Sequence, residues 1–254
     1  MTDDAARRFT AEHAHYTEDL AFWRATAART GGPVLDLGCA AGRVAIPLAR
    51  DGHEVWALDA SLEMLAELGQ RLAAEPAEVA GRVRPVGGDI AGFALPARFR
   101  LVLVAMNTLQ VLTEPEDRRS CLASVREHLA PGGELVFDVA LPDPDEIAGS
   151  LGVERPGGVH RDRESGETLR HTAWYDTWDP GTHTLEFTTR IQGSGGDAPQ
   201  EVLRHHRVHL FTPEEIRELV AGAGLEHVSV HGDFGGGPLR PWGERQVHRC
   251  RRPA

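Results

Sequence analysis

The stretch from Pro33 to Arg43, PVLDLGCAAGR, decides the fold of this chain. Its apolar side chains end abruptly in small residues, and a helical pattern from Val44 to Arg50 follows at once. This order predicts a buried parallel strand, a tight turn and a helix N-terminus. Gly38 and Gly42 let the chain turn sharply and let backbone N–H groups approach a ligand, and the positive end of the helix dipole favours an anionic group.

A second buried strand follows, from Glu54 to Asp59, and it ends in a carboxylate. In a strand–helix–strand unit, an acidic residue about 20 positions after the glycines accepts hydrogen bonds from the hydroxyl groups of a ribose. Asp59 lies at that position, although it could instead be a solvated residue that caps the helix beginning near Ser61. Together the two segments predict a nucleotide-binding α/β domain.

Two classes of cofactor use such a unit. The dinucleotide fingerprint requires G-x-G-x-x-G directly after the strand, and this chain departs from it at two of the three glycines. Residues 36–42, DLGCAAG, match instead the D-x-G-x-x-x-G signature, and in this the chain resembles the class I S-adenosylmethionine-dependent methyltransferases. Members of that family usually carry a further glycine where this chain has Ala40, which a positive φ would strain.

The resemblance implies which residues hold S-adenosylmethionine. In the family, an acidic residue after the third strand, here 83–86, bonds the adenine amino group, and the next apolar residue packs on the ring; Asp89 and Ile90 occupy these positions. An N-terminal helix of related enzymes closes over the cofactor and often brings a tyrosine near the sulfonium, a role for which Tyr16 is the candidate. The expected cofactor-binding residues are Tyr16, Asp36, Gly38, Cys39, Ala40, Gly42, Asp59, Ala60, Met64, Asp89, Ile90 and Met106.

The composition limits the classes of function. A chain of 254 residues is long enough for one α/β domain with an insertion. Its net charge of −11 argues against a nucleic-acid partner, because phosphate binding requires a basic face. No apolar run is long enough to cross a bilayer, and the acidic residues 1–4 lack a hydrophobic signal core. We therefore expect a cytoplasmic protein without a membrane partner.

Lysine and cysteine usage narrows the chemistry further. The chain contains arginine but no lysine, which excludes a Schiff-base lysine and a Walker-type phosphate lysine. Cys39, Cys121 and Cys250 have no metal-like spacing, and their odd number fits reduced thiols.

Helix and strand patterns continue on both sides of the nucleotide-binding unit. Apolar and aromatic residues on one helical face predict a helix from Phe9 to Thr26. A fourth strand, 99–105, is followed by residues 106–110 at the carboxyl edge, where α/β sheets bind ligands. Within them, Asn107 could orient a small polar acceptor or could cap a turn. The [ND]-P-P-[YF] sequence of enzymes that methylate planar amino groups is absent from this position.

Three further signals complete the core. A capping box at 113–116 predicts a helix, and the L-x-P-G-G turn at 129–133, another feature of the resemblance, precedes a fifth strand at 134–139. Asp138 in that strand could be a base, an acceptor-binding carboxylate or a packed structural residue. A second capping box at 212–215 begins the last helix, and the final strands are expected at 226–230 and 246–249.

The composition changes from Leu141 onward. Pro and Gly residues predict a long loop, and three alternating segments follow at 169–178, 182–192 and 201–211, with residues 193–199 joining the last two. This antiparallel meander either roofs the acceptor pocket or forms a homodimer face. Its histidines, His205, His206 and His209, point to mixed faces of a strand without convergent carboxylate or cysteine ligands, so we expect no metal site.

The fold class that follows is α/β: a Rossmann-like, doubly wound, seven-stranded, mostly parallel sheet with an inserted antiparallel β-meander. Residues 1–140 and 212–254 form the expected cofactor-binding core, with 1–30 as an N-terminal cap helix. Residues 141–211 form the inserted loop and β subdomain.

The function implied by the resemblance is transfer of a methyl group from S-adenosylmethionine to a nitrogen or oxygen atom of a small-molecule substrate in natural-product, amino-acid or amino-sugar metabolism. The candidate catalytic residues are Tyr16, Asn107, His205 and His209. Two alternatives stay open. The chain could bind S-adenosylmethionine as a sensor or for a non-methylation reaction, or it could be a nicotinamide-dependent reductase.

Overall fold

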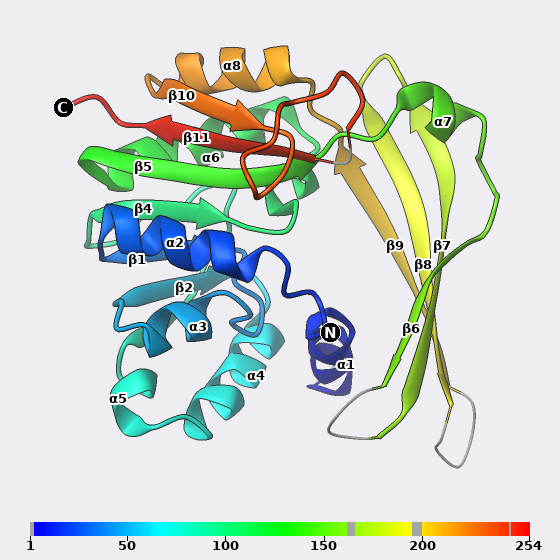
Figure 1. Ribbon diagram of the computed structural model, residues 1–254, viewed down its shortest axis with the longest axis horizontal. Helices are drawn as coiled ribbons and strands as arrows, with labels where there is room; N and C mark the ends of the chain where they lie inside the picture. The colour runs from blue at the N-terminus through cyan, green and yellow to red at the C-terminus, as the bar shows by residue number, and fades with distance from the viewer. Residues whose placement is uncertain (1–2, 162–165, 195–199, 244) are drawn as a thin grey trace.

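The computed structural model describes residues 3–161, 166–194, 200–243 and 245–254. They form a seven-stranded sheet in the order β10-β11-β5-β4-β1-β2-β3 and a four-stranded sheet in the order β6-β7-β8-β9 (Figure 1). The link expected at 193–199 falls largely on residues 195–199, which lie outside the described residues. The arrangement confirms the predicted α/β class.

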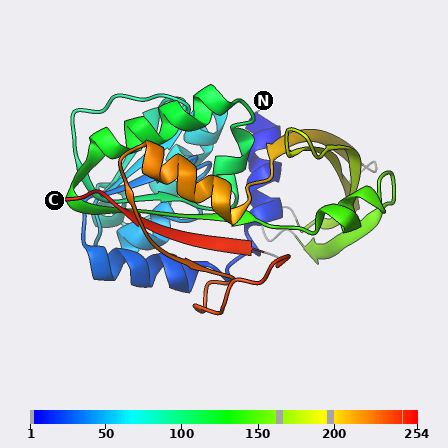
Figure 2. The same cartoon turned by 90° about the horizontal axis from the view of Figure 1, so that it is seen from above.

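The large sheet is parallel except at β11, which runs antiparallel to both β5 and β10. Helices cover both of its faces, with α2 on one side and α6 and α8 on the other (Figure 2). Every residue of β1 is buried, as expected for a central strand between two helical layers. The strands are β1 Val34–Leu37, β2 Val55–Asp59, β3 Val83–Gly87, β4 Phe99–Val104, β5 Leu129–Ala140, β10 Glu226–His231 and β11 Arg245–Arg251.

The helices begin mainly where capping residues predict. Ser61 accepts a hydrogen bond from the Met64 N–H, and the Thr212–Glu215 capping box is confirmed. The capping box expected at 113–116 is wrong: the cap residue is Glu114, whose side chain makes no capping bond, and Pro115 starts the helix. The helices are α1 Asp3–His13, α2 Leu20–Thr30, α3 Ala45–Arg50, α4 Leu62–Ala73, α5 Ala77–Ala80, α6 Pro115–His128, α7 Pro144–Ala148 and α8 Pro213–Gly222, with a 3₁₀ turn η1 at Thr108–Val111.

The single N-terminal helix expected from Phe9 to Thr26 is wrong, because the chain breaks between α1 and α2. Asp19 lies at the break and is fully buried, where it accepts a hydrogen bond from Trp23 Nε1 and pairs with Arg43. The apolar spacing continues through the break, so the spacing could not reveal it. A contact with the distant glycine turn sets the direction of the chain instead.

The inserted sheet has four strands, where three were expected. The additional strand, β6, lies in the stretch expected to be loop, and its Pro156 and Gly158 flank a register shift against β7. Proline and glycine are tolerated there because β6 is an edge strand with a bulge. The strands are β6 Arg155–Arg161, β7 Thr168–Asp179, β8 Thr184–Ser194 and β9 Gln200–His209.

The inserted sheet lies over the carboxyl edge of the large sheet, and α1 lies between them (Figures 1 and 2). Arg204 of β9 forms an ion pair with Glu12 of α1, and its guanidinium lies 5.5 Å from the centre of the Phe9 ring. Gln110 joins the same strand to the core, since its Nε2 donates to the carbonyl of His209 at 3.0 Å. The insertion therefore roofs the ligand edge of the core. In the part of the chain that the structure describes, no helix combines the length and apolar character needed to cross a bilayer.

Candidate functional site

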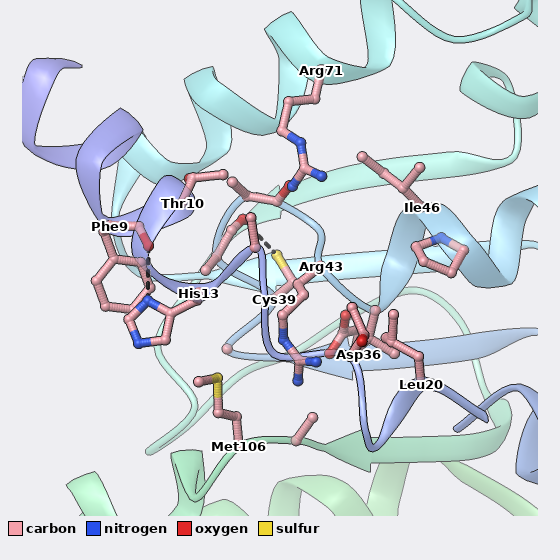
Figure 3. A pocket seen from close by; sticks show the side chains of 18 of the residues that line it. Phe9, Thr10, His13, Leu20, Asp36, Cys39, Arg43, Ile46, Arg71 and Met106 are labelled. Carbon is pink, nitrogen blue, oxygen red and sulfur yellow. Dashed lines mark hydrogen bonds between the residues drawn. The ribbon is translucent and has the colours of Figure 1, made fainter. Parts of the chain in front are cut away.

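A cavity of about 280 Å³ lies between α1 and the turn that follows β1 (Figure 3). Its walls come from α1, from the turn after β1, from α3, from Arg71 of α4 and from the residues that follow β4. Phe9 and His13 project from α1, while Cys39 and Asp36 approach from β1 and its turn. This is the edge where strand order reverses, between β1 and β4, and open α/β sheets bind ligands at such a point.

The two glycines of the motif are required by close approach. Gly38 has φ +71°, and a Cβ built on it would lie 2.4 Å from Thr108 Cγ2. Gly42 has φ +78°, and its Cβ would lie 2.5 Å from Leu68 Cδ1. Both positions combine left-handed backbone with a clash, so no larger residue fits without displacement. Ala40 between them has φ +46°, which confirms that this alanine occupies a strained conformation.

Asp36 presents an unsatisfied carboxylate oxygen to the cavity. The side chain is buried, and the Oδ2 atom has no hydrogen-bond partner among the described residues. Burial raises the pKa of Asp36 to about 7, against the opposing effect of the nearby Arg43 guanidinium. A buried acceptor left open at a cavity wall points to a ligand that carries a hydrogen-bond donor or a positive charge.

Asp59 ends β2 as predicted, and it also supports the glycine turn. Its Oδ2 accepts the Ala40 N–H at 2.8 Å, and its Oδ1 accepts the Ser61 N–H at 2.9 Å. A carboxylate offers about four lone-pair positions, so both oxygens retain capacity for the hydroxyl groups of a sugar. Asp59 is therefore fixed in place before any ligand arrives.

The residues expected around the adenine lie at the ends of β2 and β3, outside the walls of this cavity. Met64 and Ile90 are buried, and Ile90 belongs to the core beneath α6. Ala60 and Asp89 are exposed, and Asp89 Oδ1 accepts the Ala91 N–H at 2.8 Å. One exposed carboxylate, that of Asp89, therefore lies next to the buried Ile90.

Tyr16 lies in the break between α1 and α2, against Arg43, which directly follows the motif. Arg43 donates to both Asp19 carboxylate oxygens at 2.6 and 2.7 Å and to the Tyr16 carbonyl at 3.1 Å. The Tyr16 hydroxyl is buried without a hydrogen-bond partner within the described ranges, and burial raises its pKa. Tyr16 is thus a neutral phenol with an unpartnered hydroxyl, and it is not among the residues that line the cavity.

The end of β4 has an unusual backbone. Met106 and Asn107 both have φ +61°, a left-handed conformation that non-glycine residues rarely adopt. The Met106 N–H donates to Asp138 Oδ1 at 2.7 Å, and Arg245 pairs with the other oxygen of that carboxylate. Asn107 Oδ1 is buried and has no partner in the described part of the chain. Strain of this kind is typical of functional sites.

Asp138 is a structural carboxylate of this turn. It is fully buried, makes both contacts described above and is not among the residues that line the cavity, so it supports the turn from below. Burial raises its pKa to about 6, while Arg245 acts in the opposite direction. Arg245 also lies 5.9 Å from the centre of the Tyr16 ring, which connects the two ends of the site.

The two histidines expected to accept protons lie elsewhere. His205 is exposed and bonds Thr188, on the face of β9 opposite to Arg204, which contacts α1. His209 is buried beside Glu215 of α8. Neither borders the cavity at the glycine turn. The structure gives no support to either as a base.

Two side chains of the cavity wall were not foreseen as site residues. His13 Nδ1 lies 2.8 Å from the Phe9 carbonyl, so that nitrogen carries the proton and Nε2 is an acceptor (Figure 3). Burial lowers the pKa of His13 to about 4, which keeps the ring neutral. Arg71 of α4 donates to the Ala41 carbonyl at 2.5 Å and closes the turn from behind. His13 lies within the helix predicted from Phe9 to Thr26, where the periodicity gives no reason to single it out, and no local signal connects Arg71 to the turn.

Comparison with known proteins identifies similar chains. A family model described as a methyltransferase domain matches residues 34–133. The cypemycin N-terminal methyltransferase of a Streptomyces species is 30% identical over 208 residues, which cover 82% of this chain and 78% of the relative.

Solved structures of methyltransferases are also similar to this chain. The CcbJ methyltransferase from Streptomyces caelestis superposes with a TM-score of 0.80 at 29% identity, over 93% of this chain and 90% of that chain. The glycopeptide N-methyltransferase MtfA complexed with S-adenosyl-L-methionine has a TM-score of 0.61 at 30% identity, over 92% of this chain and 87% of its own.

The residues of this site fit S-adenosylmethionine. The open Asp36 oxygen suits its ammonium group, the close-packed glycine turn leaves room beside it, and Asp59 retains acceptor capacity for the ribose hydroxyls. When bound, the cofactor supplies an electrophilic methyl group on a sulfonium.

The Ala40→Gly substitution tests the strain in the turn. Glycine adopts φ +46° without the clash of a Cβ, so we expect the free energy of unfolding to rise by about 0.5–1 kcal/mol and the Tm by about 1–3 °C. Thermal unfolding of the free protein measures this. Ala41→Gly is the matched control and should lower stability, because Ala41 has no positive φ. A Tm of Ala40→Gly below that of wild type would show that the backbone at position 40 is not strained.

Cofactor binding should depend on pH through Asp36. Its pKa of about 7 means that the ammonium of S-adenosylmethionine meets an ionised carboxylate above pH 7, so the Kd should rise about tenfold from pH 8 to pH 6. The stability of the free protein should change in the opposite sense and fall as pH rises from about 4 to 7, because the folded state holds the extra proton.

Calorimetric titration with S-adenosylmethionine between pH 6 and 8 measures the binding arm of this prediction. Asp36→Asn is nearly isosteric and should bind more weakly, with a Kd that does not change over this interval. An identical pH dependence in wild type and Asp36→Asn would assign the effect to another group.

Proposed function

Because the chain belongs to the S-adenosylmethionine-dependent methyltransferases, we propose that it transfers the cofactor's methyl group to an amine nitrogen of a small natural-product molecule. The names of two relatives, an N-terminal methyltransferase of cypemycin and a glycopeptide N-methyltransferase, support a nitrogen acceptor. The net charge of −11 also suits a substrate that arrives as an ammonium cation.

The observation that carries the proposal is the open Oδ1 atom of Asn107. This carbonyl oxygen is buried without a partner in the ranges described. Asn107 is not itself a wall residue of the cavity, but its two neighbours, Met106 and Thr108, both line it. An amide oxygen accepts hydrogen bonds. When the lone pair of a primary or secondary amine is directed at the methyl carbon, the amine still has an N–H group that can donate to such an oxygen. A deprotonated hydroxyl acceptor has no such donor, so the site favours nitrogen.

The backbone that carries Asn107 is rigid. Its left-handed conformation is supported by the buried Asp138, which holds the preceding amide and is itself held by Arg245. A precisely held acceptor can orient the nucleophile behind the methyl carbon. Orientation of this kind contributes roughly 7–11 kcal/mol in well-aligned reactions.

The remaining polar groups favour positioning over base catalysis. The Tyr16 phenol is neutral because burial raises its pKa, and His13 is a weak base because burial lowers its pKa to about 4. Each can accept a hydrogen bond from the substrate. An ammonium substrate must lose one proton to become the neutral amine before its nitrogen can attack, and the methylated ammonium product can lose another after the transfer. Both protons can pass to solvent, and the protein's contribution is to hold the neutral amine in line.

The proposed reaction can be tested with paired acceptors. Small amines and the alcohols of the same skeletons are incubated with S-adenosylmethionine, and release of S-adenosylhomocysteine and the mass of each acceptor are measured. We expect a mass gain of one methylene unit on amines and none on the alcohols. Methylation of the alcohols in preference to the amines would overturn the nitrogen assignment.

Asn107→Gly isolates the side-chain oxygen, because glycine keeps the φ of +61° while it removes the amide. We expect kcat/KM for an amine acceptor to fall about 10–100-fold, with the Kd for S-adenosylmethionine within a factor of two of wild type. Steady-state kinetics and calorimetry measure the two quantities. Asn107→Asp, which keeps an oxygen acceptor and tolerates this backbone, should retain more activity than Asn107→Gly. Equal activity of Asn107→Gly and wild type would exclude the role.

A further inference from the structure

A second group of polar side chains lies away from the methyl-transfer site, where β9 passes into α8. His183 precedes β8, His209 ends β9, and Glu215 belongs to the first turn of α8. One ligand atom from each of the three residues lies within 4.8 Å of the others. We propose that these residues bind a divalent transition-metal ion of the zinc type, which fastens the inserted sheet to the core.

The distances suit such an ion. His209 Nε2 lies 2.5 Å from Glu215 Oε1, and His183 Nδ1 lies 3.6 Å from Glu215 Oε2. Zinc binds nitrogen and oxygen at about 2.0–2.2 Å, which places tetrahedral ligand atoms about 3.4 Å apart. The observed separations lie on both sides of that value. Glu215, whose side chain is 30% exposed, can move by the ångström that is needed.

His209 has an unmet hydrogen-bonding need. Its side chain is only 4% exposed, and its Nδ1 has no partner among the described residues. Nε2, not Nδ1, is the ring nitrogen that faces Glu215, so Nε2 is the ligand atom and Nδ1 carries the ring proton when an ion is bound. The proton between His209 and Glu215 occupies the position that a metal ion takes when it replaces a proton shared by two ligands.

The backbone and the helix cap orient the other two ligands. His183 has φ +52°, a strained conformation that the fold retains at this turn, and its ring centre lies 6.0 Å from that of His209. The Glu215 carboxylate accepts the Thr212 N–H as part of the capping box, which limits where it can point. Both groups are therefore directed toward His209 before an ion binds.

The surroundings attract cations. The groove that borders this cluster is lined by two arginines, Arg118 and Arg207, and by six carboxylates: Glu114, Asp179, Glu186, Glu214, Glu215 and Glu218. Excess negative charge raises the local concentration of divalent ions. Two imidazoles and one carboxylate favour zinc-type ions over Mg²⁺ and Ca²⁺, which prefer oxygen ligands. Three protein ligands leave a fourth position for water.

The cluster could not be found along the chain. The expectation of no metal site considered the histidines of β9, and no carboxylate in that strand converges with them. The carboxylate comes from α8 and the second histidine from the β7–β8 turn, so only the packing of the inserted sheet on the core brings the three together.

Titration of the tag-free, chelator-treated full chain with ZnCl₂ tests the site by calorimetry and by thermal unfolding. We expect one Zn²⁺ per chain and a Tm increase of about 5 °C at saturating metal. Bound Co²⁺ should show the visible absorption of a tetrahedral site, and Mg²⁺ should produce neither signal. These readouts do not depend on methyl transfer, so they are unaffected if the proposed acceptor is wrong.

His183→Asn is the decisive variant, because asparagine tolerates a positive φ. We expect it to weaken Zn²⁺ binding at least tenfold and to abolish the Tm increase. Glu215→Gln, which keeps the shape and a capping oxygen, should do the same. The matched control is His205→Asn, which changes an exposed histidine of β9 outside the cluster and should bind like wild type. Absence of Zn²⁺ binding, or equal losses in His183→Asn and His205→Asn, would overturn the site.

Discussion

The buried ion pair between Arg43 and Asp19 is the contact on which the site depends. Arg43 directly follows the glycine motif, and Asp19 lies in the break between the two N-terminal helices, fully buried. Loss of one partner from a buried pair costs about 3–5 kcal/mol, because the other charge is left uncompensated. The pair therefore fastens the N-terminal segment over the motif. It positions Tyr16 and closes α1 over the cavity, so one short motif forms both the floor of the site and the anchor for its cover.

Two turns at the ligand edge of the large sheet have strained backbone, and both are stabilised in the same way. Ala40 after β1 and Met106 after β4 both have positive φ, and each donates its amide N–H to a carboxylate near the end of the next strand in the sequence. Asp59 serves the first turn and Asp138 the second. Each carboxylate thus stabilises a conformation that L-residues otherwise avoid at a cost of about 1–2 kcal/mol. The two turns face each other across the switch point of the sheet, which places rigid backbone on both sides of the reacting groups.

Features that depend on residues close together in the sequence were predicted correctly, whereas features that depend on contacts between distant residues were not. The glycine motif, the strand ending in Asp59 and the cap at Thr212 were predictable, because each depends on residues within a few positions of one another. The break between α1 and α2 was missed because it is stabilised by the contact of Asp19 with Arg43, which lies 24 positions away in the sequence. His205 and His209, two of the candidate catalytic residues, do not border the cavity at the glycine turn. Alternation assigns side chains to opposite faces of a strand but does not say which face meets the core.

By itself the sequence determined the α/β fold, the cofactor class and the turn that the cofactor requires, because hydrophobic periodicity and glycine geometry are local properties of the chain. Tertiary structure alone decided how the inserted sheet is placed, which polar atoms remain open at the cavity, and which carboxylate meets the histidines at α8. Those outcomes depend on contacts such as Arg204 with Glu12 and His209 with Glu215, which join separate elements. Such pairings form only when whole elements pack, and no spacing along the chain encodes them.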